Sequence, residues 1–425
     1  MLVSGGTVVD STGRRRADVL VKGEAIAAVS EAGLSPPAGA LVLDASGCFV
    51  TPGLVDLHCH LREPGDEEAE SIETGARAAA LGGFTAVVAM PNTQPPADCA
   101  GVVRQVLDAA KGACADVRPA GTLTVGREGK RLAPMAELAA LGVKIFTDDG
   151  AGVADAGLMR RAMEYASALG VVVADHCEDA SLAGSGVMNE GALSSRLGLP
   201  GRPAVSEEVM VLRDLALARV TKARLHLLHL STAEAVGAVQ AAKAAGVAVT
   251  AEVTPHHLAL TEDALSSYST LYKVNPPLRT SSDRDALRAA LASGVLDAIA
   301  TDHAPHPPQA KETSFCDAAP GMTGLETALS VVMTELEVPL ERLLAAMSWV
   351  PARIAGLWGV HGGPVAPGSP ANICVLDPSR RWVVSPARLA SRSTNTAFAG
   401  RELTGKVRHT LLFGEPVVVD EEAQR

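Results

Sequence analysis

The sequence predicts an α/β protein, a closed (β/α)8 barrel with a small β domain built from both chain ends. Eight short and nearly continuous apolar runs follow one another between residues 54 and 303, as expected for parallel strands that are buried on both faces. Stretches with helical spacing lie between most of these runs. The segments before and after them instead alternate β-type runs with turn residues.

The expected barrel strands are residues 54–61, 85–92, 118–124, 143–147, 171–176, 224–230, 247–253 and 298–303. The expected helices include residues 71–81, 156–169, 206–220, 233–245 and 282–292. Short β-type runs such as LVSGGTVVD at the start and KVRHTLLFGEPVVV at the end indicate one composite β domain. We therefore assign residues 53–363 to the barrel, and residues 1–52 and 364–425 to the β domain.

Composition excludes several classes of protein. The 425 residues are 47% hydrophobic and carry a net charge of −11, with no basic run that could neutralise phosphates, so we expect no nucleic acid partner. No segment approaches 18 uninterrupted apolar residues, and the N-terminus lacks the features of a signal peptide, so we expect a cytoplasmic protein without membrane contact. The seven cysteines are scattered without a CxxC, which predicts neither disulfides nor a thiolate zinc site.

Polar residues mark the predicted strand ends. Catalytic groups of such barrels lie at the carboxyl ends of the strands, which meet at one face. At or just beyond those ends the sequence has His58, His60, Asn92, Asp148, Asp149, His176, His229, Asp302 and His303. The sequence therefore predicts a single polar site at this face.

The pair His58 and His60 suggests that the site binds metal. Residues two apart on a strand share a face, so both imidazoles should point into the barrel mouth while Cys59 points away. One buried histidine alone would more often be a core residue, but the convergence of four histidines and a carboxylate favours zinc or a similar divalent ion. Two ions could be held by His58, His60, His176, His229, Asp302 and one bridging group.

Six motifs together are more specific than HxH alone. They are DLHCHLREPG, MPNT at 90–93, DH at 175–176, LHLS at 228–231, VNPPLR at 274–279 and TDHAPH at 301–306. With these motifs the chain resembles the dihydroorotases of the amidohydrolase superfamily, specifically the single-chain bacterial class I type. The resemblance covers nearly the whole chain, and it implies a barrel of the metal-dependent hydrolase type.

The resemblance implies a ligand set for one or two zinc ions. His58, His60 and Asp302 would hold one position, and His176 and His229 the other. Asp149, in FTDDG, matches the carboxylate that both positions share in this class. Many relatives use a carboxylated lysine instead, and Lys144 in VKIFTDD is the alternative bridge in this chain.

The implied reaction is the zinc-dependent, reversible interconversion of (S)-dihydroorotate and N-carbamoyl-L-aspartate in pyrimidine biosynthesis. Opening a cyclic amide at neutral pH needs a strong nucleophile, which a metal ion provides as bound hydroxide. Asp302 is placed to accept the proton of the water and to pass it to the departing ring nitrogen, as general base and then acid.

The substrate is an anion, and Arg62 offers the planar fork that suits a carboxylate. The resemblance adds further substrate contacts, namely His60, Asn92, Asn275, His306, Pro320 and Gly321. For Asn275 a plain turn role before proline is the alternative. We expect His303 to point away from the site, and His256 and His257 either to pack in the core or to support site residues without binding metal or substrate themselves.

Two other functions compete with this interpretation. An allantoinase or hydantoinase would use the same barrel and metals, but it would need the bridging lysine and no carboxylate subsite. A catalytically inactive scaffold for aspartate carbamoyltransferase would have lost metal ligands, whereas all are present here. The resemblance also implies a homodimer, and for some members a complex with aspartate carbamoyltransferase.

Overall fold

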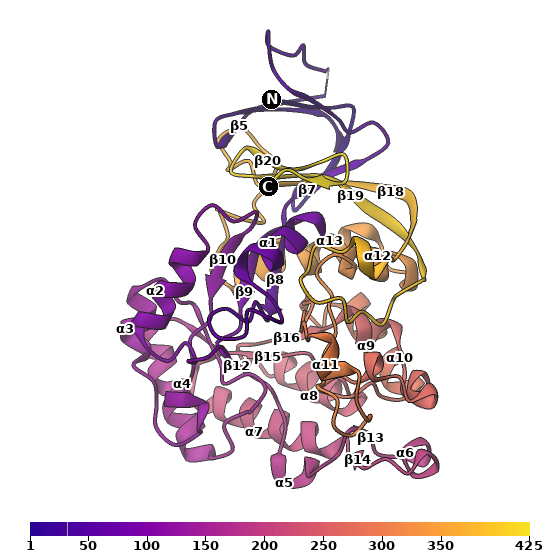
Figure 1. Ribbon diagram of the computed structural model, residues 1–425. Coiled ribbons are helices and arrows are strands. Elements are labelled where there is room, and N and C mark those ends of the chain that lie inside the picture. The colour runs from indigo at the N-terminus through magenta and orange to yellow at the C-terminus, as the bar shows by residue number, and fades with distance from the viewer. Residues whose placement is uncertain (32) are drawn as a thin grey trace.

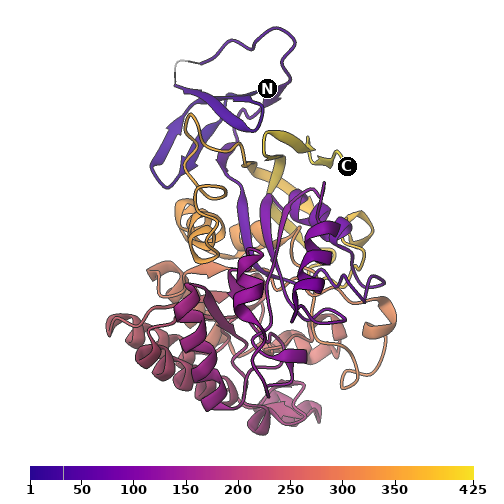
Figure 2. The ribbon, with the colours of Figure 1, turned by 90° about the vertical axis from the view of Figure 1, so that its left-hand side faces the viewer.

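The computed structural model describes residues 1–31 and 33–425. A barrel of strands ringed by helices makes up most of the molecule, and β sheets that contain both chain termini lie at one end (Figures 1 and 2). Short elements in long loops lie at the opposite end (Figure 1). They are α5 (Ala180–Ala183), β13 (Met188–Asn189), α6 (Ala192–Leu197) and β14 (Gly201–Arg202).

The barrel consists of a three-stranded and a five-stranded parallel sheet, in the orders β10-β9-β8 and β11-β12-β15-β16-β17. Parallel bridges between Gly121 and Phe146, and between Cys59 and His303, join the two sheets on both sides, so the ring is closed. The predicted fold class is therefore confirmed. The strands are β8 (Leu54–Cys59), β9 (Phe84–Ala89), β10 (Asp116–Pro119), β11 (Ile145–Phe146), β12 (Val172–Asp175), β15 (Arg224–Leu227), β16 (Val249–Val253) and β17 (Ala298–Ile299).

The five predicted helices begin and end within one residue of the prediction, because their capping residues can be recognised in the sequence. For α4, the Asp155 carboxylate accepts a hydrogen bond from the Leu158 N–H, and Gly170 ends the helix at φ +67°. These five are α1 (Ile72–Leu81), α4 (Ala156–Leu169), α7 (Val205–Thr221), α8 (Ala233–Ala244) and α10 (Ser281–Ser293). The other helices are α2 (Ala100–Ala109), α3 (Met135–Ala140), α9 (Pro255–Ala259), α11 (Pro308–Lys311), α12 (Ala328–Glu335), α13 (Leu340–Met347) and α14 (Trp349–Ile354).

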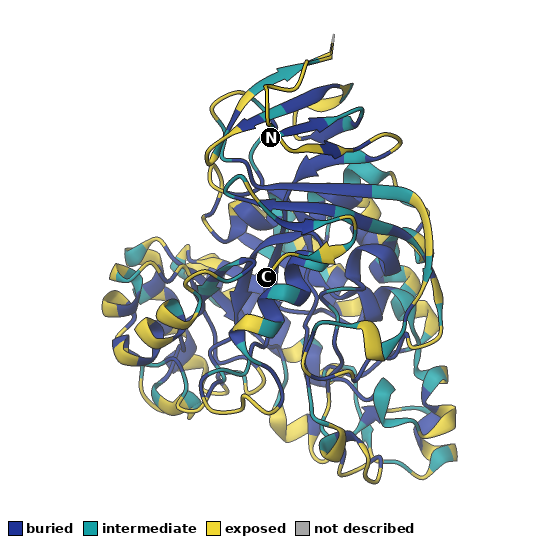
Figure 3. Ribbon diagram, turned by 45° about the horizontal axis from the view of Figure 1, so that its top comes forward, coloured by how far each residue is buried: buried dark blue, intermediate teal, exposed yellow. Residues whose placement is uncertain are grey.

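Two apolar layers hold the barrel together. Alternate strand residues face outward and pack under the helices, while the others fill the barrel interior. In the interior, Val55 and Leu57 of β8 pack with Val172 and Ala298, and Ile354 of α14 joins the same cluster. Figure 3 shows this division, with buried strands at the centre and exposed residues on the outer helices.

The β domain joins the two chain ends. Its seven-stranded sheet has the order β21-β20-β19-β18-β7-β2-β3, and β7 pairs with β18 on one side and with β2 on the other. A second sheet has the order β5-β4-β1-β6. The N-terminal strands are β1 (Leu2–Ser4), β2 (Thr7–Asp10), β3 (Gly13–Arg16), β4 (Asp18–Lys22), β5 (Ala25–Ser30), β6 (Val42–Asp44) and β7 (Phe49–Pro52). The C-terminal strands are β18 (Ile373–Val383), β19 (Glu402–Leu412), β20 (Glu415–Val419) and β21 (Glu422–Ala423).

Val50 and Ile373, which come from opposite ends of the chain, share one apolar core in this domain. We propose the domain boundary at residues 52 and 53, since β7 ends at Pro52 and β8 begins at Leu54. The boundary at residue 364 stays a prediction. Among the described residues, no helix combines the length and apolar character that a membrane span requires.

Candidate active site

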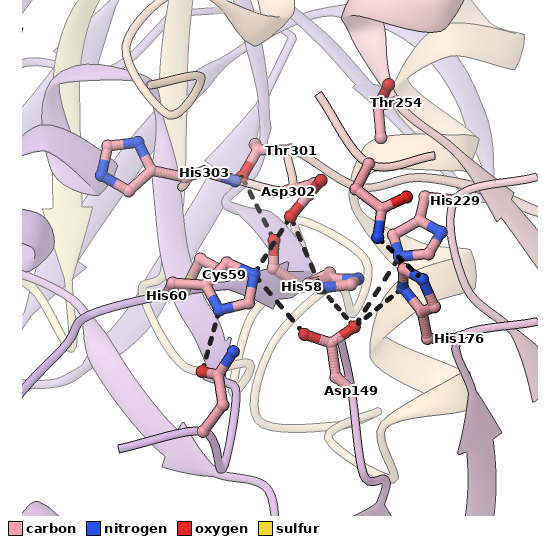
Figure 4. A network of polar contacts seen from close by, with 12 residues as sticks. His58, Cys59, His60, Asp149, His176, His229, Thr254, Thr301, Asp302 and His303 are labelled. Carbon is pink, nitrogen blue, oxygen red and sulfur yellow. Dashed lines mark hydrogen bonds and ion pairs between the residues drawn. The ribbon is translucent and has the colours of Figure 1, made fainter. Parts of the chain in front are cut away.

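The predicted ligands converge at the carboxyl ends of the barrel strands, around Asp149. Figure 4 shows His58 and His60 on one side of this carboxylate and His176 and His229 on the other. Oδ1 of Asp149 lies 3.4 Å from Nε2 of His58, 3.7 Å from Nδ1 of His176 and 3.7 Å from Nε2 of His229. Its Oδ2 lies 3.6 Å from Nε2 of His60. Asp149 therefore stands between two pairs of imidazoles.

Asp302 closes the cluster on the side of His58 and His60. Its Oδ1 lies 3.1 Å from Nε2 of His60 and 3.6 Å from Nε2 of His58. The Asp302 backbone has φ +44°, a left-handed conformation that costs energy for a residue with a side chain. His229 (φ +28°) and Arg62 (φ +61°) are similar, so three of the site residues occupy strained positions.

Asp56 explains how β8 presents its two histidines. Val55 and Leu57 face the barrel interior, so strict alternation would turn His58 outward. The register of β8 is irregular between Asp56 and Cys59, which brings His58 to the interior face. The Asp56 carboxylate accepts hydrogen bonds from the backbone N–H of His58 (3.3 Å) and of Thr301 (2.9 Å). Asp56 thus supports His58 and the residue before Asp302 together.

Glu252, on β16, forms the layer beneath the site. Its Oε1 accepts a hydrogen bond from Nδ1 of His58 at 2.9 Å, and its Oε2 lies 2.9 Å from Nε2 of His226. The backbone N–H of His229 also points to Oε1, at 3.3 Å. Burial alone would raise the pKa of Glu252, but the hydrogen bonds from His226 and His58 lower it to about 2. Glu252 is therefore an anion that orients His58.

The donor atoms fit a divalent metal. At this site, two groups of three have all their ligand atoms within 4.8 Å of one another: His58, His60 and Asp149, and Asp149, His176 and His229. Nε2 of His58 and Oδ1 of Asp149 are buried and have no hydrogen-bond partner among the described residues. Buried polar atoms are nearly always satisfied, so this arrangement is typical of ligands that meet a cation. Imidazole and carboxylate together suit zinc or a similar ion.

The two candidate bridging groups lie in different places. Lys144 precedes β11 and is exposed, so it lies at the end of the strand away from the site. The neighbouring Asp148 is also turned aside, since its Oδ1 accepts the backbone N–H groups of Leu123 (2.9 Å) and Thr124 (3.0 Å). Only Asp149 of these three residues lies among the histidines.

The predicted anion subsite lies beside His60. The Arg62 guanidinium donates from Nε to the Pro305 carbonyl at 3.2 Å, and its Nη2 is 3.4 Å from Nε2 of His306. Burial lowers the pKa of Arg62, and no carboxylate of the described residues forms an ion pair with it. Oδ1 of Asn92 is 3.0 Å from Nδ1 of His60. A half-buried guanidinium without a counter-ion is suited to an anionic ligand.

The predicted ring-recognition residues lie on the other flank. Nδ2 of Asn275 is 3.3 Å from Nε2 of His176, and its Oδ1 accepts a hydrogen bond from Arg202. Nε2 of His306 lies 2.9 Å from the Pro320 carbonyl, and burial lowers the pKa of His306 to about 3. Gly321 has φ +134°, and a Cβ there would come within 2.6 Å of the Cβ of Ala304. A cavity of about 230 Å³ opens here, lined partly by Asn275, Pro320 and Arg202.

Other histidines lie outside the cluster, as predicted for His303. Nε2 of His303 contacts Glu70 at 3.2 Å, and its Nδ1 accepts the Gly324 N–H at 3.0 Å, so the ring points away from Asp149 (Figure 4). Nε2 of His257 lies 3.1 Å from the Pro276 carbonyl. His256 is buried against His257, with ring centroids 4.6 Å apart.

Sequence reasoning missed Asp56, Glu252 and Arg202. Each is a charged residue that supports a site residue; Glu252 and Arg202 belong to no motif, and Asp56 opens the motif DLHCHLREPG without having been given a role. Glu252 had one signal that could have found it, since a glutamate inside the apolar run VTAEV is buried only when it is paired. Lys311 was also missed, although its Nζ donates to the carbonyls of Ala319 (2.7 Å) and Gly321 (3.0 Å).

Comparisons with known proteins agree with this geometry. A family model described as dihydro-orotase-like matches residues 47–235. A dihydroorotase of Streptomyces coelicolor is 51% identical over 95% of this chain and 95% of its own length. A dihydroorotase of Anaeromyxobacter dehalogenans is 48% identical over 100% of this chain and 99% of its own. Among solved structures, an L-hydantoinase (dihydropyrimidinase) from Arthrobacter aurescens superposes with a TM-score of 0.89 at 25% identity, covering 100% of this chain and 97% of that one.

Proposed function

The chain belongs to the dihydroorotase family, and on that premise we propose that it interconverts (S)-dihydroorotate and N-carbamoyl-L-aspartate in pyrimidine biosynthesis. The observation that carries the proposal is the half-buried guanidinium of Arg62, which lies beside the His58–His60 pair and has no protein carboxylate as partner. In a cyclic amide with a ring carboxylate, the carboxylate would bind Arg62 while the amide lies at the His58–His60 pair.

We propose zinc as the metal of this site. His58, His60 and Asp302 would hold one position, His176 and His229 the other, and Asp149 would serve both. A divalent ion bound here would lower the pKa of a water molecule, so that this water could act as a nucleophile at neutral pH, and it would polarise the ring carbonyl. Glu252 keeps Nδ1 of His58 protonated and so leaves Nε2 free to act as a ligand.

The chain's own residues move the protons and hold the substrate. In the hydrolytic direction the water adds to the ring carbonyl carbon and the carbon–nitrogen bond breaks. Asp302 takes the proton that the water loses and returns it to the ring nitrogen, and in the biosynthetic direction the same transfers run in reverse. Arg62, Asn92 and His306 would bind the ring carboxylate, with His60 in contact beside them.

Asn275 and the backbone of Pro320 and Gly321 would read the amide edges of the ring. Because Arg202 donates to Oδ1 of Asn275, the NH2 group of Asn275 is the end that faces the site. That group can donate to a ring carbonyl but cannot accept from a ring N–H. The side chain of Asn275 is therefore suited to one edge of the ring only.

Hydantoinase is the second candidate function, and the close superposition with the Arthrobacter enzyme favours it. Two observations argue for dihydroorotase instead: the dihydroorotase relatives are 48–51% identical against 25% for that hydantoinase, and Lys144 lies away from the cluster. The proximity of the six side chains that we propose as ligands argues against the inactive-scaffold alternative.

A matched pair of substrates tests the proposal. Dihydroorotate and dihydrouracil share a ring and differ in the carboxylate, so kcat/KM should favour dihydroorotate by at least ~10³-fold in a site built to bind that group. Hydantoin and allantoin should be poor substrates. Turnover of the uncharged rings alone would refute dihydroorotase and support the hydantoinase. A protein without activity after zinc addition would support the scaffold.

We also propose that the protein acts in the cytoplasm as a homodimer. Assembly with aspartate carbamoyltransferase is a separate proposal, which co-purification of the two proteins from cell extract would test.

A further inference from the structure

Helix α7 is apolar on two opposite faces. Its inner face packs on the barrel through residues such as Met210, Val211 and Leu215, which are buried. Its outer face presents Val205, Val209, Leu212 and Val220, which are 42%, 42%, 57% and 63% exposed. With the exposed Ala216, these residues follow a spacing of four, three, four and four, so they form one continuous stripe, called here the α7 stripe.

The neighbouring helix α4 shows what an outer barrel helix normally exposes. Its solvent face carries Arg160, Arg161 and Glu164, with an ion pair between the first and the last of these residues. Leu182, which is 41% exposed, lies on α5, a short helix in contact with α7. Figure 1 places α5 and α7 at the end of the molecule away from both termini. A contiguous exposed apolar surface of this kind is typical of a protein interface.

The α7 stripe is self-complementary. Its spacing is nearly symmetrical about Leu212, so a second copy running antiparallel would set Val205 against Val220 and Val209 against Ala216. A two-fold axis produces this kind of pairing, in which one patch contacts the same patch of the other copy.

Charges at the two ends of α7 support the antiparallel arrangement. Glu208 lies in the first turn and Arg219 in the last, and neither has an ion-pair partner in the described part of the chain. Partial burial and the nearby Glu234 and Glu207 raise the pKa of Glu208, so an external cation would stabilise its charge. The pairs above place the two-fold axis between residues 212 and 213. Glu208 of one copy then lies only about 3 Å along the helix axis from Arg219 of the other copy, at 1.5 Å per residue.

We propose that the outer face of α7 is the interface between two copies of this chain, packed antiparallel across a two-fold axis beside Leu212. The inference rests on the proposed homodimer and assigns its surface. A 17-residue helix is about 25 Å long. Together with the shorter flanking helices α5 and α8, spaced at roughly 10 Å, it offers on the order of 500 Å² per copy, or about 1,000 Å² for the pair, which is the lower end of the range for a specific interface.

The inner face of α7 connects this interface with the active site. Glu207 accepts the backbone N–H groups of Ser231 (3.1 Å) and Thr232 (3.0 Å), just beyond His229. Arg213 lies 3.6 Å from Asp175, the residue before His176. The helix that would be covered in the dimer therefore braces both histidines of the second metal position.

Analytical ultracentrifugation of the full chain tests the interface. The wild-type protein should be a dimer at micromolar concentration and Leu212→Glu a monomer. Val383→Glu, at a site that is 57% exposed on β18, is the matched control and should stay dimeric. A monomeric wild type, or a Leu212→Glu variant that remains dimeric, would overturn the proposal. Dihydroorotase assays of the same samples keep this result separate from the proposed function.

Two milder sets of variants avoid the risk of misfolding. With the exposed Cys99 and Cys316 changed to serine, Leu212→Cys should form a disulfide-linked dimer on oxidation and Val383→Cys should not. Glu208→Arg or Arg219→Glu alone should weaken the dimer by about tenfold, and the double reversal should restore it. Absence of both the cross-link and the charge rescue would refute the antiparallel arrangement.

Discussion

Glu252 accepts a hydrogen bond from Nδ1 of His58 at 2.9 Å and thereby decides which nitrogen of that ring faces Asp149. The same carboxylate reaches His226 and the backbone of His229. One buried anion on β16 thus supports residues from two other strands, including a ligand from each proposed metal position.

Glu252→Gln should therefore weaken metal binding while the fold is kept. The amide has nearly the same shape but no charge, so it orients His58 less strongly, and we expect a loss of ~10–100-fold in zinc affinity. Titration against a competing chelator measures this loss directly. Glu234→Gln, on the exposed face of α8, is the matched control. Equal affinities in the two variants would show that Glu252 serves packing only.

Asp302→Asn should nearly abolish turnover. An amide cannot relay the proton, so kcat should fall by ~10²–10⁴-fold, and the acidic limb of the pH–rate profile should disappear. Metal content must be measured in parallel, because Asp302 is also a proposed ligand. A variant that retains zinc and normal activity would remove Asp302 from the acid/base role.

Arg62→Met should act mainly on binding. Loss of charge-assisted hydrogen bonds to the ring carboxylate should raise KM for dihydroorotate by roughly 10–100-fold, with a smaller effect on kcat. Arg62→Lys keeps the charge but lacks the planar fork, so its KM for dihydroorotate should lie between those of the wild type and Arg62→Met. Any residual turnover of dihydrouracil should be unaffected. An unchanged KM would mean that the carboxylate binds elsewhere.

His306 should make stability depend on pH. Burial, followed by the nearby Arg62, lowers its pKa from 6.5 to about 3, so between these values the unfolded chain binds a proton that the folded chain does not. Neutral His306 therefore makes its full contribution to the free energy of unfolding above about pH 6.5, and this contribution is lost as the pH falls toward 3. His306→Gln removes the titration. Its Tm should fall less than that of the wild type between pH 7 and pH 5, and parallel Tm curves would contradict the assignment.

The barrel and the position of its site could be predicted from the sequence, because both follow from local patterns. Apolar runs alternating with capped helices identify the strands, and the carboxyl ends of parallel strands necessarily meet at one face. That is why His58, Asp149 and His229, far apart along the chain, could be assigned to one cluster. The helix limits were equally legible, since caps such as Asp155 and Gly170 act over a few residues.

The supporting residues could not be predicted in this way. Asp56 reads as an ordinary strand residue, yet it holds the irregular register that turns His58 inward. Arg202 sits in a long loop with no periodic signal, and only the folded loop brings it against Asn275. The residue type alone does not show whether such a residue supports the site, because its role depends on a partner that is distant in the sequence.

The amino-acid sequence alone determined which chemical groups gather at the barrel mouth, since it specifies the order of the strands and the side chain at the end of each. The tertiary structure decided which atoms of those groups face one another. It placed Asp149 among four imidazoles, left Lys144 exposed before β11, and set Glu252 beneath His58. The physical reason is that ligand geometry depends on contacts between distant strands, and irregular backbone at a strand end overrides the simple alternation of side chains.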